Sequence, residues 1–149
     1  QHLTFIIKSF IFKNAMVQKL FFIFVLLMSV PALADLDNKG IGPAKNIKIP
    51  QKIDKNLSSE GKELYKLKCA SCHKLDERFA GPPLRGVTIR RSPEWVLNQI
   101  VNPAEMASKD PIAKALVGEY YLIMPNQNIN LEEARKIYEY LRIIDHEGK

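Results

Sequence analysis

Hydrophobic positions near the C-terminus recur at intervals of three and four residues. The segment that opens at Asn130 places apolar side chains on one face and charged side chains on the other, which predicts an amphipathic helix. Its apolar positions are Leu131, Ala134, Ile137, Tyr138, Leu141 and Ile144. No stretch of the chain alternates convincingly at a period of two. The predicted fold class is therefore all-α.

Start signals mark three further helices. Two serines followed by a glutamate predict a helix over 58–69, because a hydroxyl caps the first turn and an acid suits its dipole. Ser-Pro-Glu predicts a second helix over 92–102, and Asp-Pro predicts a third over 110–121. The loops between them are long and rich in Gly and Pro, so we expect a bulky enclosed cofactor to fill the middle of the domain.

The first third of the chain is typical of targeting and connecting sequence. Residues 16–34 combine an early lysine, a short apolar run and an Ala-x-Ala end, which predicts a signal peptide cleaved before Asp35; an uncleaved anchor is the alternative. The apolar run is about half of the roughly 20 residues that a spanning helix needs. Residues 1–15 precede this signal and are interpreted as a mispredicted start. Residues 35–57 lack helical periodicity and predict an extended linker or arm, which leaves 58–149 as the folded domain.

The net charge of the chain comes partly from its N-terminal segment. The formal charge is +6, and it falls to +3 when residues 1–34, with three lysines and no acid, are set aside. A nucleic-acid-binding domain usually has a strongly basic face, so no nucleic-acid partner is expected.

The two cysteines of the chain lie in one short motif. Cys69-Ala-Ser-Cys72-His73 is the C-x-x-C-H pattern of covalent haem attachment. Two intervening residues place both sulfurs on one turn, where they can reach two vinyl groups, and the following imidazole can reach the iron. A dithiol redox pair would follow a strand, and a zinc site needs about four ligands, whereas the only other histidine after Asp35 is His146. The motif predicts one covalent haem c with His73 as an iron ligand.

The residues around this motif resemble the opening helix of class I cytochromes c. Gly61, Tyr65 and Cys69 follow one another at intervals of four residues, as in that family. The resemblance implies a class I cytochrome c fold, with N- and C-terminal helices that cross around one haem. It also implies that Gly61 lets the two backbones approach. The partner positions on the last helix would be Ile137, Tyr140 and Leu141.

Two further segments resemble the family. Gly81-Pro-Pro-Leu84 is similar to its G-P-x-L turn, which implies that the Pro82 carbonyl accepts a hydrogen bond from the Nδ1 atom of His73. Met124-Pro125 is similar to the distal methionine segment and implies Met124 as the sixth iron ligand. Met106 is the competing methionine, with packing as its other role, and His146 or an open site are lesser alternatives.

The resemblance also indicates residues for the haem propionates. Trp95 resembles a family tryptophan near a propionate, with core packing as the alternative. Arg85, and with it Arg90 and Arg91, are candidates for pairing with propionates, although exposed arginines usually face water.

The function implied by the resemblance is single-electron transfer rather than catalysis. We expect a periplasmic carrier between a quinol–cytochrome c oxidoreductase and a terminal oxidase or periplasmic reductase, with membrane contact only through partners or an uncleaved signal. His/Met ligation raises the potential and closes the iron. Lysines near the motif are expected to steer acidic partners: Lys62, Lys66, Lys68 and Lys74. The alternative is a haem enzyme or ligand sensor with a labile sixth ligand.

Overall fold

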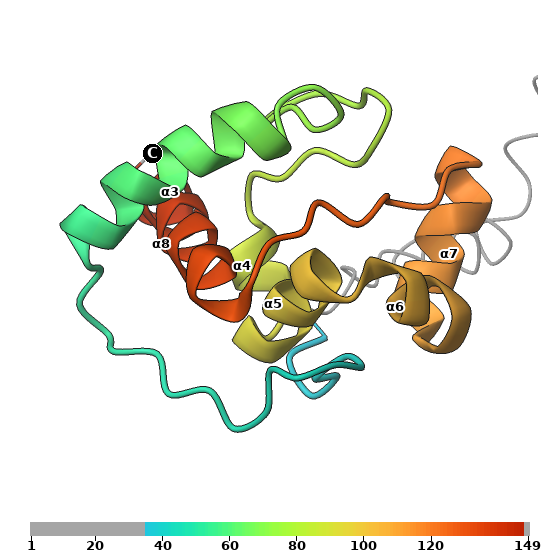
Figure 1. Ribbon diagram of the computed structural model, residues 1–149, viewed down its shortest axis with the longest axis horizontal. Helices are drawn as coiled ribbons and strands as arrows, with labels where there is room; N and C mark the ends of the chain where they lie inside the picture. The colour runs from blue at the N-terminus through green and yellow to red at the C-terminus, as the bar shows by residue number, and fades with distance from the viewer. Residues whose placement is uncertain (1–34, 148–149) are drawn as a thin grey trace, which may run out of the picture. The chain divides into compact units, whose positions relative to one another are not determined.

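The computed structural model describes residues 35–147, which form six helices joined by irregular segments (Figure 1). The helices are α3 (Lys55–Lys68), α4 (Val87–Arg90), α5 (Pro93–Val101), α6 (Pro103–Lys109), α7 (Pro111–Tyr120) and α8 (Leu131–Glu147). This part of the chain contains no β-strand, only one isolated parallel bridge between Asp35 and Arg91. The all-α prediction is confirmed. The segment 1–15, interpreted as a mispredicted start, and the signal peptide predicted at 16–34 both lie outside the described residues.

No helix within residues 35–147 combines the length and the apolar character that crossing a membrane requires.

The first and last described helices, α3 and α8, form the most extensive helix–helix contact (Figure 1). Gly61 lies at their crossing, where a Cβ atom would collide with the backbone carbonyl of Lys136. The rings of Tyr65 and Tyr140 lie beside each other, with centroids 5.2 Å apart. Ile137 is 1% exposed and belongs to the same core. The crossing expected from the family resemblance is therefore present.

The helix starts agree with the sequence prediction at three of four positions. Ser92 and Asp110 cap α5 and α7 by accepting backbone N–H groups, and Asn130 caps α8 through its bond to the Glu133 N–H. The cap of α3, however, is Asp54, whose carboxylate accepts the N–H groups of residues 56 and 57. This helix therefore begins at Lys55 rather than 58, because an aspartate upstream of the two serines supplies the cap.

Two helices were not predicted from the sequence. The turn that ends α5 at Asn102 also starts α6, with Pro103 at its first position. An asparagine followed by a proline can end one helix and begin the next. The sequence analysis predicts only the end of the first helix at this position. The second, α4, has four residues and is too short to show a period.

The arm over residues 35–54 packs on the helices and belongs to the same compact unit. The side chain of Asn98 on α5 accepts the Ala44 N–H at 2.8 Å and donates to the carbonyls of Lys39 and Ala44. Ala44 and Asn98 are 2% and 1% exposed, so these bonds are shielded from water. The segment expected to be an extended linker or arm therefore packs on the helices as an arm.

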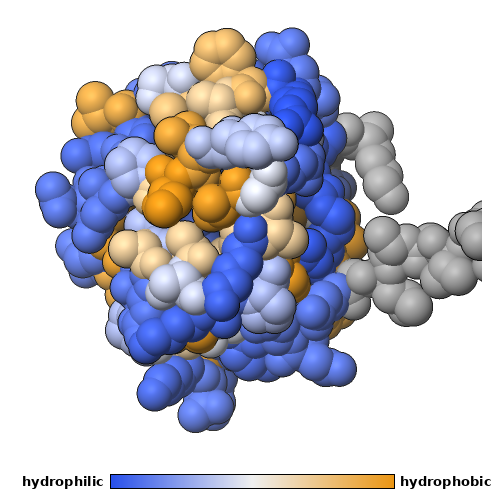
Figure 2. Space-filling model, turned by 90° about the vertical axis from the view of Figure 1, so that its right-hand side faces the viewer, coloured by the Kyte–Doolittle hydropathy of each residue, from blue (hydrophilic) through white to orange (hydrophobic). Residues whose placement is uncertain are grey.

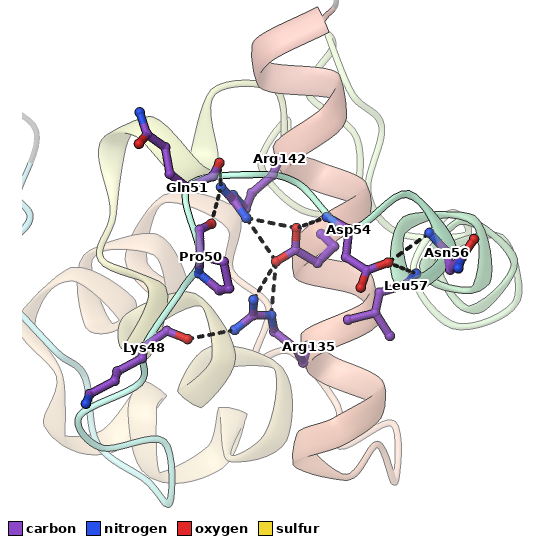
Figure 3. Close-up of polar contacts among 9 residues, drawn as sticks. Lys48, Pro50, Gln51, Asp54, Asn56, Leu57, Arg135 and Arg142 are labelled. Carbon is purple, nitrogen blue, oxygen red and sulfur yellow. Dashed lines mark hydrogen bonds and ion pairs between the residues drawn. The ribbon is translucent and has the colours of Figure 1, made fainter.

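A buried ion cluster on α8 holds the end of the arm (Figure 3). Glu139 is fully buried and accepts hydrogen bonds from Arg135 at 2.7 Å and from Arg142 at 2.9 Å. The Arg142 guanidinium also donates to the backbone carbonyls of Pro50 and Gln51, at 3.0 Å each. The cluster thus joins the chain before α3 to the helix that α3 crosses.

Candidate functional site

The C-x-x-C-H motif forms one tight turn at the end of α3. Cys69 ends the helix with its N–H bound to the Tyr65 carbonyl, and the N–H groups of Cys72 and His73 both donate to the carbonyl of Cys69. The Tyr65 hydroxyl donates to the His73 carbonyl at 2.8 Å and fastens the turn to the helix. Both thiols and the imidazole therefore line one cavity.

The environment of Cys69 does not suit a thiol–disulfide carrier. Burial, and secondarily the neighbouring Cys72, raises the pKa of the Cys69 thiol to about 11. The thiolate is the reactive form in disulfide exchange, and carriers lower the thiol pKa instead. Within residues 35–147, no three His, Cys, Asp or Glu side chains are grouped as metal ligands.

His73 is held in one orientation by the turn that follows it. Its Nδ1 atom lies 3.0 Å from the Pro82 carbonyl oxygen. This bond assigns the proton to Nδ1 and leaves Nε2 as the free nitrogen. Burial lowers the pKa of His73, and the bond to Pro82 partly opposes this effect. Gly81 lies against the ring, because a Cβ atom there would be 2.8 Å from Nδ1 and 3.0 Å from Nε2.

Met124 lines the same cavity, although it is far from the motif in sequence. It lies in the irregular segment between α7 and α8, and its Sδ atom is 3.7 Å from the Nε2 atom of Gln99 on α5. Most of the remaining lining is apolar. These apolar residues include Val87, Val96, Ile100, Leu116, Val117, Leu122, Ile137 and Leu141. Figure 2 shows hydrophobic side chains gathered on the α7 side of the molecule, bordered by hydrophilic ones.

These residues fit a haem c. Two thiols and an imidazole occupy one turn, an apolar cavity adjoins them, and a thioether lies on its wall. The absence of a side chain at Gly81 lets the imidazole lie flat against the backbone. The buried Oε1 atom of Gln99 has no hydrogen-bond partner within the described residues, so the cavity is not simply a packed interior.

Comparison with known proteins agrees with this geometry. The family model described as "Cytochrome c" matches residues 58–144. The chain belongs to the cytochrome c family. Members of this family carry covalently bound haem c and transfer electrons, so this cytochrome binds one covalent haem c, and Cys69 and Cys72 are consistent with its attachment motif. No curated protein matches the chain at a significant level.

Several solved structures resemble this chain. Cytochrome c from Rhodothermus marinus is 42% identical, with a TM-score of 0.70 over 72% of this chain and 92% of that one. An engineered form of the same protein, bound to a carbene intermediate, is 42% identical with a TM-score of 0.65, over 70% of this chain and 90% of that one. A cytochrome c domain from Pseudomonas putida is 32% identical with a TM-score of 0.52, over 57% of this chain and 87% of that one.

The two candidate methionines of this cytochrome c occupy different environments. Met106 on α6 is fully buried, lies outside the cavity lining, and accepts the Ile41 N–H on its Sδ atom at 3.0 Å. Its sulfur therefore holds the arm, which is the packing role considered for it from the sequence. Of the two, only Met124 lines the cavity.

Of the four residues predicted near the haem propionates, Trp95, Arg90 and Arg91 line the cavity and Arg85 does not. Arg85 is not among the residues that line the cavity, because its guanidinium pairs with Asp76 and donates to the Ile144 carbonyl. Its assignment as a haem contact therefore stays a prediction, which its present partners do not favour. Trp95 lines the cavity, but its indole N–H donates to Asp110 at 3.1 Å, so it contributes an apolar wall rather than a free donor.

The other two predicted arginines do line the cavity of this cytochrome. Arg90 and Arg91 are both lining residues, and the guanidinium of Arg91 lies 5.6 Å from the centre of the Trp95 ring. Both follow Arg85 closely in sequence, so the sequence indicates which segment carries the propionate candidates. It does not indicate which of the three arginine side chains reach the cavity.

The sequence analysis missed one residue of the cavity lining, Gln99, and one residue that braces a loop beside it, Arg78. Arg78 joins the loop after His73 to the end of α7 through bonds to the Glu119 side chain and carbonyl, at 2.7 Å each. Gln99 is a polar residue on an otherwise apolar helix face, next to Val96 and Ile100. That break in the apolar pattern was the available signal for Gln99; nothing in the sequence indicated Arg78.

Proposed function

We propose that this cytochrome is an exported monohaem electron carrier whose iron is held by His73 and Met124. The observation that carries the proposal is that both residues line one apolar cavity beside the two haem-attachment cysteines. An imidazole and a thioether together raise the reduction potential and leave no open position for a substrate.

The residues of the cavity suit a fast one-electron reaction. A bound haem supplies the one-electron couple at its iron. The Pro82 carbonyl fixes the imidazole of His73 and increases its basicity as a ligand. The apolar lining excludes water, so little solvent has to reorganise when the charge at the iron changes. Arg90 and Arg91 are the groups of the lining that would pair with propionate carboxylates.

The proposed place of action is the periplasm, and the proposed partners are redox proteins. Haem c attachment takes place after export, which agrees with the signal expected over residues 16–34. A quinol–cytochrome c oxidoreductase would donate electrons, and a terminal oxidase or periplasmic reductase would accept them. Lys62 is exposed near the motif, whereas Lys66 pairs with Glu63 and Lys74 donates to the Ala70 carbonyl. Steering by this face would be weak and dependent on ionic strength.

The test is spectroscopy of the exported protein from a host that attaches haem. The expected product keeps its haem after acid–acetone extraction and shows the weak far-red band of Fe–S(Met) coordination. Met124→Ala removes this band and lowers the reduction potential, because the sulfur ligand is lost.

Met106→Ala is the matched control, since it removes the other methionine of the domain. We expect it to lower stability but to keep the far-red band. A band that survives in Met124→Ala and disappears in Met106→Ala would refute the ligand assignment.

A haem enzyme or ligand sensor is the second candidate, because an engineered relative is bound to a carbene intermediate. In that case the iron would bind carbon monoxide readily in the reduced wild-type protein. For the proposed carrier, carbon monoxide binds appreciably only after Met124→Ala opens the position.

A further inference from the structure

Gln99 lies beside the proposed sulfur ligand. Its side chain comes from α5, and its Nε2 atom is 3.7 Å from the Sδ atom of Met124. Both residues line the haem cavity. The other amide atom, Oε1, is buried and has no hydrogen-bond partner within the described residues.

Packing alone does not account for a glutamine at this position. The neighbouring lining residues from α5, Val96 and Ile100, are aliphatic. An aliphatic side chain at 99 would continue this wall without leaving an amide oxygen unpaired, which is unfavourable in a buried place. The amide orientation also has a physical reason. A donor N–H facing the sulfur is attractive, whereas a carbonyl oxygen facing its lone pair would be repulsive.

We propose that Gln99 is a positioning residue that donates an N–H to Met124 and thereby tunes the haem potential. The inference rests on the proposed function, since it requires the sulfur to be an iron ligand. A thioether sulfur has two lone pairs, so one can bind the iron while the other accepts the amide hydrogen. The hydrogen bond withdraws electron density from the sulfur. Oxidised iron depends more on that density than reduced iron, so the bond favours the reduced state.

The experiment compares redox titrations of the wild-type holoprotein, Gln99→Leu and Gln99→Glu. We expect both variants to keep the far-red band and to shift the equilibrium toward the oxidised state about threefold to tenfold. This corresponds to a potential roughly 30 to 60 mV lower, at about 59 mV per factor of ten for one electron. Glutamate has nearly the shape of glutamine, so it carries the test if leucine prevents haem incorporation. Burial raises the pKa of a carboxyl group, so the titration of this variant is run at a pH at which the group is ionised. The carboxylate then lacks a donor and adds negative charge, so its shift should be at least as large.

Nuclear magnetic resonance of the reduced protein gives a second measurement. The Met124 methyl group lies in the ring current of the haem when the sulfur is bound, so its resonance reports the orientation of the side chain. We expect this resonance to move in both Gln99 variants. A merely structural role would lower stability without moving the potential and the methyl resonance together.

Gln127→Leu is the matched control. This glutamine follows Met124 in the same segment and donates to the Pro125 carbonyl at 3.2 Å, but it is not a cavity-lining residue. Its loss should leave the potential and the methyl resonance unchanged. Unchanged values in both Gln99 variants, or an equal shift in Gln127→Leu, would overturn the inference while leaving Met124 as ligand. Loss of the ligand assignment itself would instead appear as a far-red band that persists in Met124→Ala.

Discussion

Gly81 lies so close to the His73 ring that the site leaves no room for a side chain at this position. A Cβ atom there would lie 2.8 Å from the Nδ1 atom of His73, inside the contact distance of the two atoms. The ring cannot yield freely, because its Nδ1 atom is bound to the carbonyl of the next residue, Pro82. The position therefore links the backbone of the turn to the orientation of His73, the proposed iron ligand.

We expect Gly81→Ala to lower the free energy of unfolding by about 1–3 kcal/mol through overpacking. It should also shift the reduction potential, because the imidazole must turn away from Pro82. Denaturant unfolding and redox titration measure the two effects. Gly118→Ala on α7 is the control: a Cβ atom meets nothing within 4 Å there, so alanine should stabilise its helix by about 0.5–1 kcal/mol. Equal stability of the two variants would contradict this account of Gly81.

The contact of α3 with α8 depends on a second glycine. A Cβ atom at Gly61 would meet the Lys136 carbonyl oxygen and lie 2.9 Å from the backbone nitrogen of Ile137. Both obstacles are backbone atoms, so the helices must separate to accept a side chain.

For Gly61→Ala we predict a loss of about 3 kcal/mol, at the upper end of the usual range for overpacking. Haem absorbance during denaturant unfolding measures it. The loss should be larger than for Gly81→Ala, where a side chain rather than a helix has to move.

The ion cluster on α8 is expected to stabilise the protein only while it is complete. Glu139 is fully buried between Arg135 and Arg142, so removing its charge leaves two guanidinium groups without compensation. Glu139→Gln should therefore cost about 3 kcal/mol of unfolding free energy.

The matched control is Glu132→Gln on the same helix. Glu132 pairs with Lys136 at 3.5 Å, but its side chain is 81% exposed, so less than about 0.5 kcal/mol should be lost. Thermal unfolding of both variants tests the difference; a similar effect at the two positions would show that burial does not matter here.

At the scale of the whole molecule, the arm is held by buried polar side chains rather than by a helix or strand of its own. Asn98 makes three hydrogen bonds to the arm backbone, and Met106 makes one. These contacts come from α5 and α6, so the arm covers both helices, of which α5 lines the haem cavity.

Asn98→Ala should release the arm and cost about 3 kcal/mol, at roughly 1 kcal/mol for each hydrogen bond. Limited proteolysis with thermolysin would then cleave residues 35–50 faster than in the wild type, while the haem spectrum stays unchanged. Lys45→Ala, at an exposed position of the same arm, should leave the cleavage rate unaltered.

Local features of the sequence were sufficient for four of the six helices in the described residues and for one half of the site. Helix caps at Ser92 and Asp110 act within three residues, and the C-x-x-C-H motif with the Pro82 turn spans fewer than fifteen. Interactions of that range depend on neighbours in the chain, so a pattern in the sequence can specify them. The sequence by itself therefore determined the all-α class, the haem attachment and the orientation of His73.

Tertiary structure decided which distant residues reach the cavity. Met106 and Met124 both lie near a proline, and only packing shows that one sulfur binds the arm while the other lines the cavity. Arg85 differs from Arg90 and Arg91 for the same reason, since Asp76 engages its guanidinium. Gln99 meets Met124 because α5 and the segment before α8 come together in space. Contacts between segments far apart in the chain arise from the packing of whole elements, which no local spacing encodes.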